Sequence, residues 1–350
     1  MSPTRHGPWG DAPEPGPPEG VSAPPTRVAV NATDFLAAQR TNRRNTILLI
    51  VILLALGAIL GYLLGAIAEA YTVPAATTAA GVSAFGILGA GGLVSIGLIA
   101  TAVTFAAGGP LILGLAGARA VDKDAEPVLH NVVEEMAIAA GLPKPQVTVI
   151  ETDVPNAFAT GMEPKKAAIG VTRGLLSSLN RDELQGVIGH EMGHILNWDT
   201  RYMTAVAILV GLIALVCDGA RRMVFYGSLG ERRDRDDRRG SSLGPLIAVF
   251  IVFAILAPIA AQLVRFAVSR QREYLADATS VQLTRNPLGL IGALEKLAAA
   301  QHPFPGANRA TQHMFIVNPF KVFGPNSMAL FSTHPPLEQR IERLRNLGIL

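Results

Sequence analysis

The sequence predicts a mainly α-helical membrane protein that also carries a water-soluble α+β domain with a small sheet. Three observations predict it: the composition, two long uncharged segments, and a later stretch in which helical and strand-like patterns alternate. Hydrophobic residues make up 49% of the 350 residues and charged residues only 16%, which is more apolar than an average soluble protein. The net charge of +3 gives no reason to expect a nucleic-acid partner.

Two N-terminal segments, within residues 40–118, are predicted to cross a membrane. Residues 47–68 and residues 84–118 contain no charged side chain, and a helix of about 20 residues spans a bilayer. Gly57, Gly61 and Gly65 recur at four-residue spacing in the first segment, which allows a second helix to approach closely. We interpret this surface as packing within one subunit, with dimerisation as the alternative.

Positively charged residues flank the two segments on one side only. Three arginines between residues 40 and 44 precede the first segment, and Arg119 and Lys123 follow the second, whereas residues 69–83 between them contain neither Lys nor Arg. Cytoplasmic loops carry the excess of Lys and Arg in membrane proteins. The N-terminus and the residues after 119 are therefore predicted to be cytoplasmic, in a multi-pass protein of the cell membrane.

Two further apolar runs, at residues 203–216 and 246–264, leave the number of spans open. They lie within residues 202–266 and are joined by a charged loop, residues 218–245, that contains ERRDRDDRR. The first run is short for a span. We predict four spans, and two spans with a buried or interfacial hairpin is the alternative. The proline-rich residues 1–35 are predicted to form a disordered tail.

The predicted water-soluble domain is discontinuous, with a first part at residues 119–201 and a second part at residues 267–350. Asn180 is a favourable N-cap for a helix that begins at Arg181. The patterns of the first part further predict a helix at residues 124–140 and strands at residues 146–151 and 167–171.

The helix that begins at Arg181 contains HEMGH at residues 190–194. Residues four apart lie on one face of a helix, so the imidazoles of His190 and His194 can reach the same metal ion. Zinc lowers the pKa of a coordinated water to about 7, and Glu191 can accept the proton as a general base. This H-E-x-x-H pattern predicts a zinc site that hydrolyses peptide bonds.

A catalytic zinc takes three protein ligands and keeps one position open. The stretch SRQREYLADA at residues 269–278 places Glu273 and Asp277 four residues apart, on one face of a predicted helix. Glu273 is the predicted third ligand. Asp277 is predicted to accept a hydrogen bond from a ligand imidazole and so fix its tautomer.

Three motifs together, HEMGH, EYLAD and the C-terminal STHPPLEQR, resemble the HtpX family of membrane zinc endopeptidases, which are related to the CAAX prenyl endoprotease. The resemblance runs from about residue 40 to the C-terminus. It implies a cytosolic zincin-like metalloprotease domain with one Zn²⁺ per chain. The implied roles are metal ligands at His190, His194 and Glu273, a general base at Glu191, and an acidic residue behind the first histidine at Asp277.

The resemblance also implies residues that bind the substrate. Asn156, Ala157 and Phe158 resemble the stretch that holds the substrate backbone. Residues 167–171, including Ala168, Ile169 and Gly170, resemble the edge strand that pairs with an extended substrate, which is β-augmentation.

The motif THPPLEQR contains His334 and Arg340, which resemble the pair that stabilises the oxyanion of the tetrahedral intermediate. The alternative is a structural role, in which the prolines start a helix and Arg340 pairs with Glu338 or Glu342. Asp199, just after the motif helix, is predicted to pair with nearby basic groups such as Arg201.

These features predict a membrane-embedded zinc metalloendopeptidase that acts on membrane proteins or unfolded polypeptides at the cytosolic face of the membrane. The resemblance implies a role in membrane protein quality control. The alternative is a non-catalytic zinc-binding membrane scaffold; structural zinc sites usually have four ligands, often cysteines, and Cys217 is the only cysteine. A transporter is a third, weaker interpretation. The sequence has no G-x-x-x-x-G-K-[ST] motif, so no ATP requirement is expected.

Overall fold

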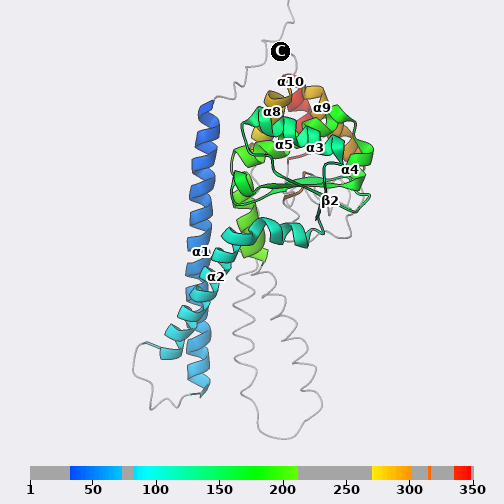
Figure 1. The fold of residues 1–350 in the computed structure, drawn as a ribbon. Helices are drawn as coiled ribbons and strands as arrows, with labels where there is room; N and C mark the ends of the chain where they lie inside the picture. The colour runs from blue at the N-terminus through cyan, green and yellow to red at the C-terminus, as the bar shows by residue number, and fades with distance from the viewer. Residues whose placement is uncertain (1–31, 73–81, 212–269, 301–313, 317–334, 348–350) are drawn as a thin grey trace, which may run out of the picture.

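A computed structural model describes residues 32–72, 82–211, 270–300, 314–316 and 335–347. Most of the predicted tail, the charged loop, the run at 246–264 and His334 lie outside the described residues. The described part is mostly helical and contains one small sheet. In Figure 1, two long helices lie beside a compact domain of helices and strands and extend beyond it.

The two long helices are α1 (Ala32–Thr72) and α2 (Ala84–Leu115). Both are long and apolar enough to cross a membrane, and only 11% and 6% of their most apolar windows are buried inside the molecule. A core helix of a soluble protein would be mostly buried, so this exposure suggests a membrane protein.

The helices α1 and α2 pack against each other through their glycines. A Cβ atom added at Gly61 would lie 2.2 Å from the carbonyl oxygen of Gly89, and one added at Gly65 would clash with the backbone of Phe85 in the same way. Only glycine permits this approach. The interpretation of the glycine spacing as packing within one subunit is thereby confirmed.

The sheet is mixed and has four strands, in the order β1-β2-β4-β3. β1 and β2 are antiparallel, β2 and β4 are parallel, and β4 and β3 are antiparallel. The strands are β1 (Arg119–Ala120), β2 (Gln146–Ile150), β3 (Ala157–Thr160) and β4 (Ala168–Thr172), with the 3₁₀ turn η2 (Pro164–Lys166) between the last two.

The prediction that residues 167–171 form an edge strand is wrong. Ala168, Ile169 and Gly170 lie in β4, which is bonded to β2 along one side and to β3 along the other. Both rows of backbone groups are therefore taken, and no substrate can pair with this strand. Within the described residues the edge next to β4 is β3, which holds Ala157 and Phe158.

Helices cover one face of the sheet, and the end of α2 covers the other (Figure 1). The side chains of Val147, Ala159 and Ile169 join the helical core, whereas those of Phe158 and Ala168 pack with the end of α2. This alternation is the period of two expected of strands. The helices of the domain are α3 (Pro127–Ala140), α4 (Arg173–Ser178), α5 (Arg181–Leu196), α8 (Arg270–Thr284), α9 (Pro287–Ala299) and α10 (Leu337–Leu347).

The helix that carries the H-E-x-x-H motif, α5, begins as the sequence predicts. The side chain of Asn180 accepts a hydrogen bond from the backbone of Glu183, whose carboxylate in turn accepts one from the backbone of Asn180, forming a capping box. The helix does not run straight into the next apolar segment. It ends at Leu196, Trp198 adopts a left-handed φ of 62°, and a new helical segment covers residues 199–211.

Candidate metal centre

The helix α5 presents His190 and His194 on one face, and close packing brings α8 against that face. A Cβ atom added at Gly193 would lie 3.1 Å from the Cα atom of Ala276 on α8. The hydroxyl of Ser280 donates a 2.6 Å hydrogen bond to the carbonyl of Gly186. Small residues on α5 thus allow the carboxylates of α8 to reach the two histidines.

Three buried side chains form a cluster that can hold a metal ion: His190, His194 and Glu273. The Nε2 atoms of the two histidines are 3.2 Å apart, and each lies 3.7 Å from an oxygen of Glu273. In a tetrahedral zinc site with bonds of about 2.0–2.1 Å, neighbouring ligand atoms lie about 3.3 Å apart. The donor set and its spacing therefore fit a metal ion.

Each of the two histidines in the cluster is held from behind by a carboxylate. The Nδ1 atom of His190 lies 2.9 Å from Asp277, and the Nδ1 atom of His194 lies 3.0 Å from Asp199. A carboxylate that accepts the Nδ1 proton leaves Nε2 free to bind a metal. The position of Asp277 agrees with the role expected of it, whereas the matching role of Asp199 was missed.

Glu191 lies beside the cluster and is only 1% exposed. The Glu191 carboxylate accepts a hydrogen bond from the backbone N–H of Ala159 on β3, while its Oε2 atom has no hydrogen-bond partner among the described residues. Burial raises the pKa of this carboxyl to about 7, with a contribution from the negative charge of Glu273 and against the opposing effect of His194. A carboxylate with a free oxygen and a pKa near neutrality suits a general base.

The two histidines of the cluster differ in their pKa values. Burial and the nearby charge of Arg340 lower the pKa of His190 to about 4, against the effect of Asp277. Burial also disfavours the charged form of His194, but the hydrogen bond to Asp199 and the charge of Glu273 outweigh it and raise its pKa to about 9. A metal must therefore displace a proton chiefly from His194.

Arg340 is completely buried and pairs with α8. Its Nε and Nη2 atoms donate hydrogen bonds of 2.9 and 2.6 Å to the two carboxylate oxygens of Asp277, and Nη2 lies 3.3 Å from Nδ1 of His190. The alternative prediction of a local pair with Glu338 or Glu342 is wrong, because both of these side chains are exposed on the opposite side of α10. The oxyanion role of Arg340 stays a prediction, since its predicted partner lies outside the described residues.

Asp199 does not pair with Arg201 as predicted. Its Oδ1 atom lies 3.3 Å from Nε of Arg272 and accepts a 2.6 Å hydrogen bond from the amide of Asn42 on α1. Arg201 instead stacks on the rings of Phe105 and Trp198. Asn42 was missed because no local pattern links it to a residue 157 positions away.

The predicted substrate-binding residues divide between two strands. Asn156 precedes β3 and bonds with Thr172 through its backbone, so the backbone groups of Ala157 and Ala159 point away from β4. The carbonyl of Ala157 accepts a 2.9 Å hydrogen bond from the N–H of Ile316. The outer edge of β3 therefore runs from Ile316 to Glu191, next to the cluster.

Comparisons with known proteins identify the family. Residues 123–348 match the model of peptidase family M48. Curated relatives named "Protease HtpX homolog" include one from Caldanaerobacter subterraneus subsp. tengcongensis, 52% identical over 67% of this chain and 76% of the relative. Others come from Pyrococcus furiosus, 47% identical over 68% and 80%, and from Streptococcus uberis, 43% identical over 87% and 97%.

Among solved structures, the crystal structure of S. mikatae Ste24p aligns with a TM-score of 0.42 and 18% identity, over 88% of this chain and 66% of that one. The sequence matches support a metalloprotease, and the buried cluster suggests its metal ion. They confirm the resemblance that the motifs indicate. The matched region covers more than half of the sequence, and the chain belongs to peptidase family M48.

Proposed function

We propose that this protein is a zinc-dependent endopeptidase held in the cell membrane, which cuts membrane proteins or unfolded polypeptides at the cytosolic face. One observation carries the proposal: the buried cluster of His190, His194 and Glu273 lies beside Glu191, whose Oε2 has no partner among the described residues. A solely structural metal site has no need for a buried carboxylate that is not a ligand.

The donor set favours zinc as the metal. Two imidazoles and one carboxylate are the ligands of the His₂Glu class of catalytic zinc sites, in which a fourth position stays open. A bound zinc ion supplies a Lewis acid and lowers the pKa of water to about 7. Asp277 and Asp199 orient the two imidazoles toward it.

Glu191 serves as the proton carrier of the reaction. Its free oxygen takes the proton of the attacking water and then gives it to the nitrogen of the leaving amine. The raised pKa suits both steps, because a base of about 7 can accept and release a proton near neutral pH. The N–H of Ala159 holds the carboxylate in place. We further propose that Arg340, with His334, stabilises the oxyanion.

The substrate pairs with the outer edge of β3. This edge ends at Glu191, so a paired peptide lies beside the base. The N–H of Ala157 already donates to Oδ1 of Asn156 and that of Ala159 to Glu191, so the substrate pairs through the carbonyl groups of this edge. The N–H of Ile316 bonds the carbonyl of Ala157 in this structure, and a substrate backbone would take its place. Main-chain pairing gives affinity with little sequence preference, which suits a role in the quality control of damaged membrane proteins.

The end of α2 reaches the underside of the sheet, which supports a domain seated close to the membrane (Figure 1). Arginines in the N-terminal part of α1, ahead of its uncharged segment, and basic residues after α2 favour a cytoplasmic N-terminus and active site. Substrates are therefore membrane proteins with an exposed cytosolic segment, or unfolded chains. Neither ATP nor a nucleic acid is part of the proposal.

Cleavage of casein by the full-length protein in detergent tests the proposed function. The wild type and Glu191→Gln are purified without metal, loaded with zinc, and compared for zinc content and for cleavage rate. The substitution keeps the size of the side chain and leaves the three ligands in place. We expect about one zinc in both proteins and cleavage by the wild type alone.

The other outcomes contradict the proposal in distinct ways. If both proteins bind zinc and neither cuts casein or an unfolded membrane protein, the non-catalytic scaffold is favoured. If Glu191→Gln cuts as fast as the wild type, Glu191 is not the base. If the wild type binds no metal, the cluster is not a metal site.

A further inference from the structure

The break after α5 turns Asp199 back toward the metal cluster. Asp199 follows His194 by five residues, and at about 100° per residue an unbroken helix would place the two side chains about 140° apart. The left-handed Trp198 interrupts the helix. Oδ2 of Asp199 consequently comes within 3.0 Å of Nδ1 of His194.

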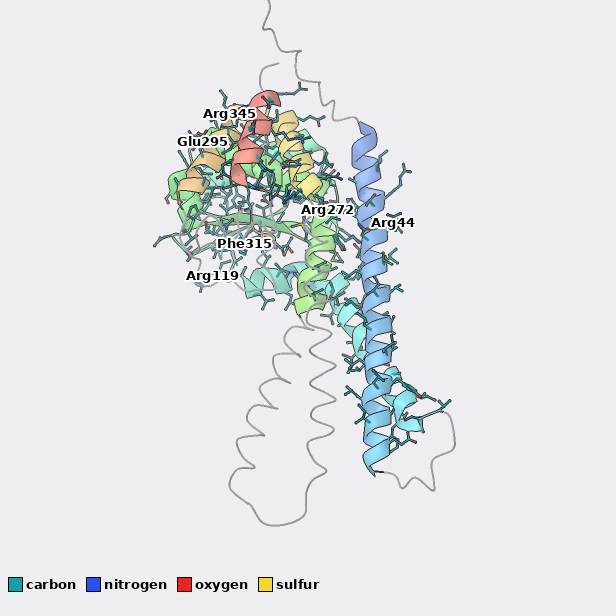
Figure 2. The ribbon with its side chains drawn as sticks, turned by 180° about the vertical axis from the view of Figure 1, so that it is seen from behind. Arg44, Arg119, Arg272, Glu295, Phe315 and Arg345 are labelled. Carbon is teal, nitrogen blue, oxygen red and sulfur yellow. The ribbon has the colours of Figure 1, made fainter. Side chains whose placement is uncertain are left out.

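The other oxygen of Asp199 is held by two donors from distant parts of the chain. Nε of Arg272 on α8 lies 3.3 Å from Oδ1, and the amide nitrogen of Asn42 on α1 lies 2.6 Å from it. The same amide nitrogen is 2.9 Å from the carbonyl oxygen of Asn197, where the helix ends. Figure 2 shows Arg272 on the side of the domain that faces α1.

Asn42 is as deeply buried as a core residue. Its side chain is 2% exposed, although it belongs to a helix whose surface is largely exposed. A buried amide that bonds a carboxylate and a carbonyl fixes both groups in direction. Asp199 is thereby held in the position that accepts the proton of His194 Nδ1.

We propose that Asn42 is a positioning residue of the metal centre, acting on His194 through Asp199. This inference rests on the proposed metal site. In this proposal α1 contributes to the hydrogen-bond network behind a metal ligand, in addition to anchoring the protein in the membrane. The network behind His190 differs, because Asp277 is held by Arg340 from within the domain.

Gln39 supplies the matched control. It lies one turn before Asn42 on α1, and its amide donates a 2.7 Å hydrogen bond to the carbonyl of Leu196 at the end of α5. Gln39 therefore docks α1 on the same helix end without touching Asp199. A change at Gln39 removes one docking bond, whereas a change at Asn42 also releases the carboxylate behind His194.

The test compares Asn42→Leu and Gln39→Ala with the wild type, as full-length proteins in detergent. Metal affinity is measured by competition with a chelator, and the geometry of the site by the visible absorption of the cobalt-loaded protein. Loss of a residue behind a metal ligand weakens binding by about 10–100-fold, and we expect roughly 10-fold for Asn42→Leu because it acts through Asp199. The cobalt spectrum should change in Asn42→Leu only. The melting temperature of each metal-free variant is measured as well, because Asn42→Leu removes two hydrogen bonds and Gln39→Ala removes one.

A double-mutant cycle separates positioning from general damage. In an Asp199→Asn background, Asn42→Leu should lower metal affinity little further, because the residue through which it acts is already altered. If Asn42→Leu fails to fold, Asn42→Ala and Asn42→Ser replace it in the same comparison.

The proposal is overturned if Asn42→Leu and Gln39→Ala weaken metal binding equally, or if neither does. Full additivity with Asp199→Asn overturns it as well. A wild type that binds no metal would instead reject the proposed function itself.

Discussion

Replacing Arg340 by methionine should destabilise the domain strongly. Arg340 and Asp277 are both buried and share hydrogen bonds of 2.9 and 2.6 Å. Removing one partner of a buried ion pair costs about 3–5 kcal/mol, because the other charge is left in the interior. For a domain of this size 1 kcal/mol corresponds to about 2–4 °C, so the melting temperature should fall by roughly 6–20 °C.

The matched control lies on the same helix. Arg345 is 2.8 Å from Glu295, but its side chain is 63% exposed. Figure 2 labels both residues. Exposed pairs contribute about 0–1 kcal/mol, so Arg345→Met should hardly change the melting temperature. Both variants are unfolded by heat without metal, in the same detergent, and followed by far-ultraviolet circular dichroism.

The double variant Arg340→Met/Asp277→Leu tests the cause of the loss. It also removes the stranded carboxylate, so it should recover part of the lost stability. Equal melting temperatures for Arg340→Met and Arg345→Met would refute the reasoning. A double variant less stable than the single one would show that packing around Arg340, rather than its charge, dominates.

Three further predictions concern packing and metal binding. A Cβ atom at Gly186 would lie 2.6 Å from a backbone nitrogen of α9. Gly186→Ala should therefore lower the free energy of unfolding, measured by denaturant titration, by about 1–3 kcal/mol. Gly91→Ala on α2, where the space around the glycine is open, should leave it unchanged. Gly61→Ala should lower the melting temperature by forcing α1 and α2 apart, while Gly57→Ala, with its nearest neighbour at 3.8 Å, should be tolerated; equal effects would contradict the packing. The pKa of His194 is raised to about 9, so below that pH a metal must replace a proton on this imidazole. Metal affinity should therefore rise about tenfold per pH unit from pH 7 toward 9. Calorimetry in buffers of different ionisation enthalpy counts the released protons, and a pH-independent affinity would contradict this prediction.

The sequence predicts well whatever a short local pattern encodes. The capping box at Asn180 begins the motif helix where it was expected. The spacing of His190 and His194, and of Glu273 and Asp277, places these side chains on facing surfaces of α5 and α8. Helical periodicity fixes which side chains share a face, so four residues in two short motifs are enough to predict the cluster.

The order of strands was not predictable in the same way. β3 and β4 are both fully buried along their length, so neither has the alternating pattern of a half-exposed edge strand. Which of them lies at the edge depends on the parallel pairing of β2 with β4, which skips the intervening strand β3. Backbone pairing of this kind leaves no mark on the side chains, and the prediction for residues 167–171 failed for that reason.

The supports of the two ligand histidines show the same limit more sharply. Asp277 shares a helix with Glu273, so the sequence could pair it with a histidine. Asp199, by contrast, reaches His194 only because Trp198 breaks the helix. The donors behind these carboxylates, Arg340 and Asn42, lie on α10 and α1, far along the chain in opposite directions. A metal needs its ligands at helical spacing, but a hydrogen bond that orients a ligand can come from any element that packs nearby. The ligands of such a site can therefore be read from a motif, while the residues that hold them in place require the assembled fold.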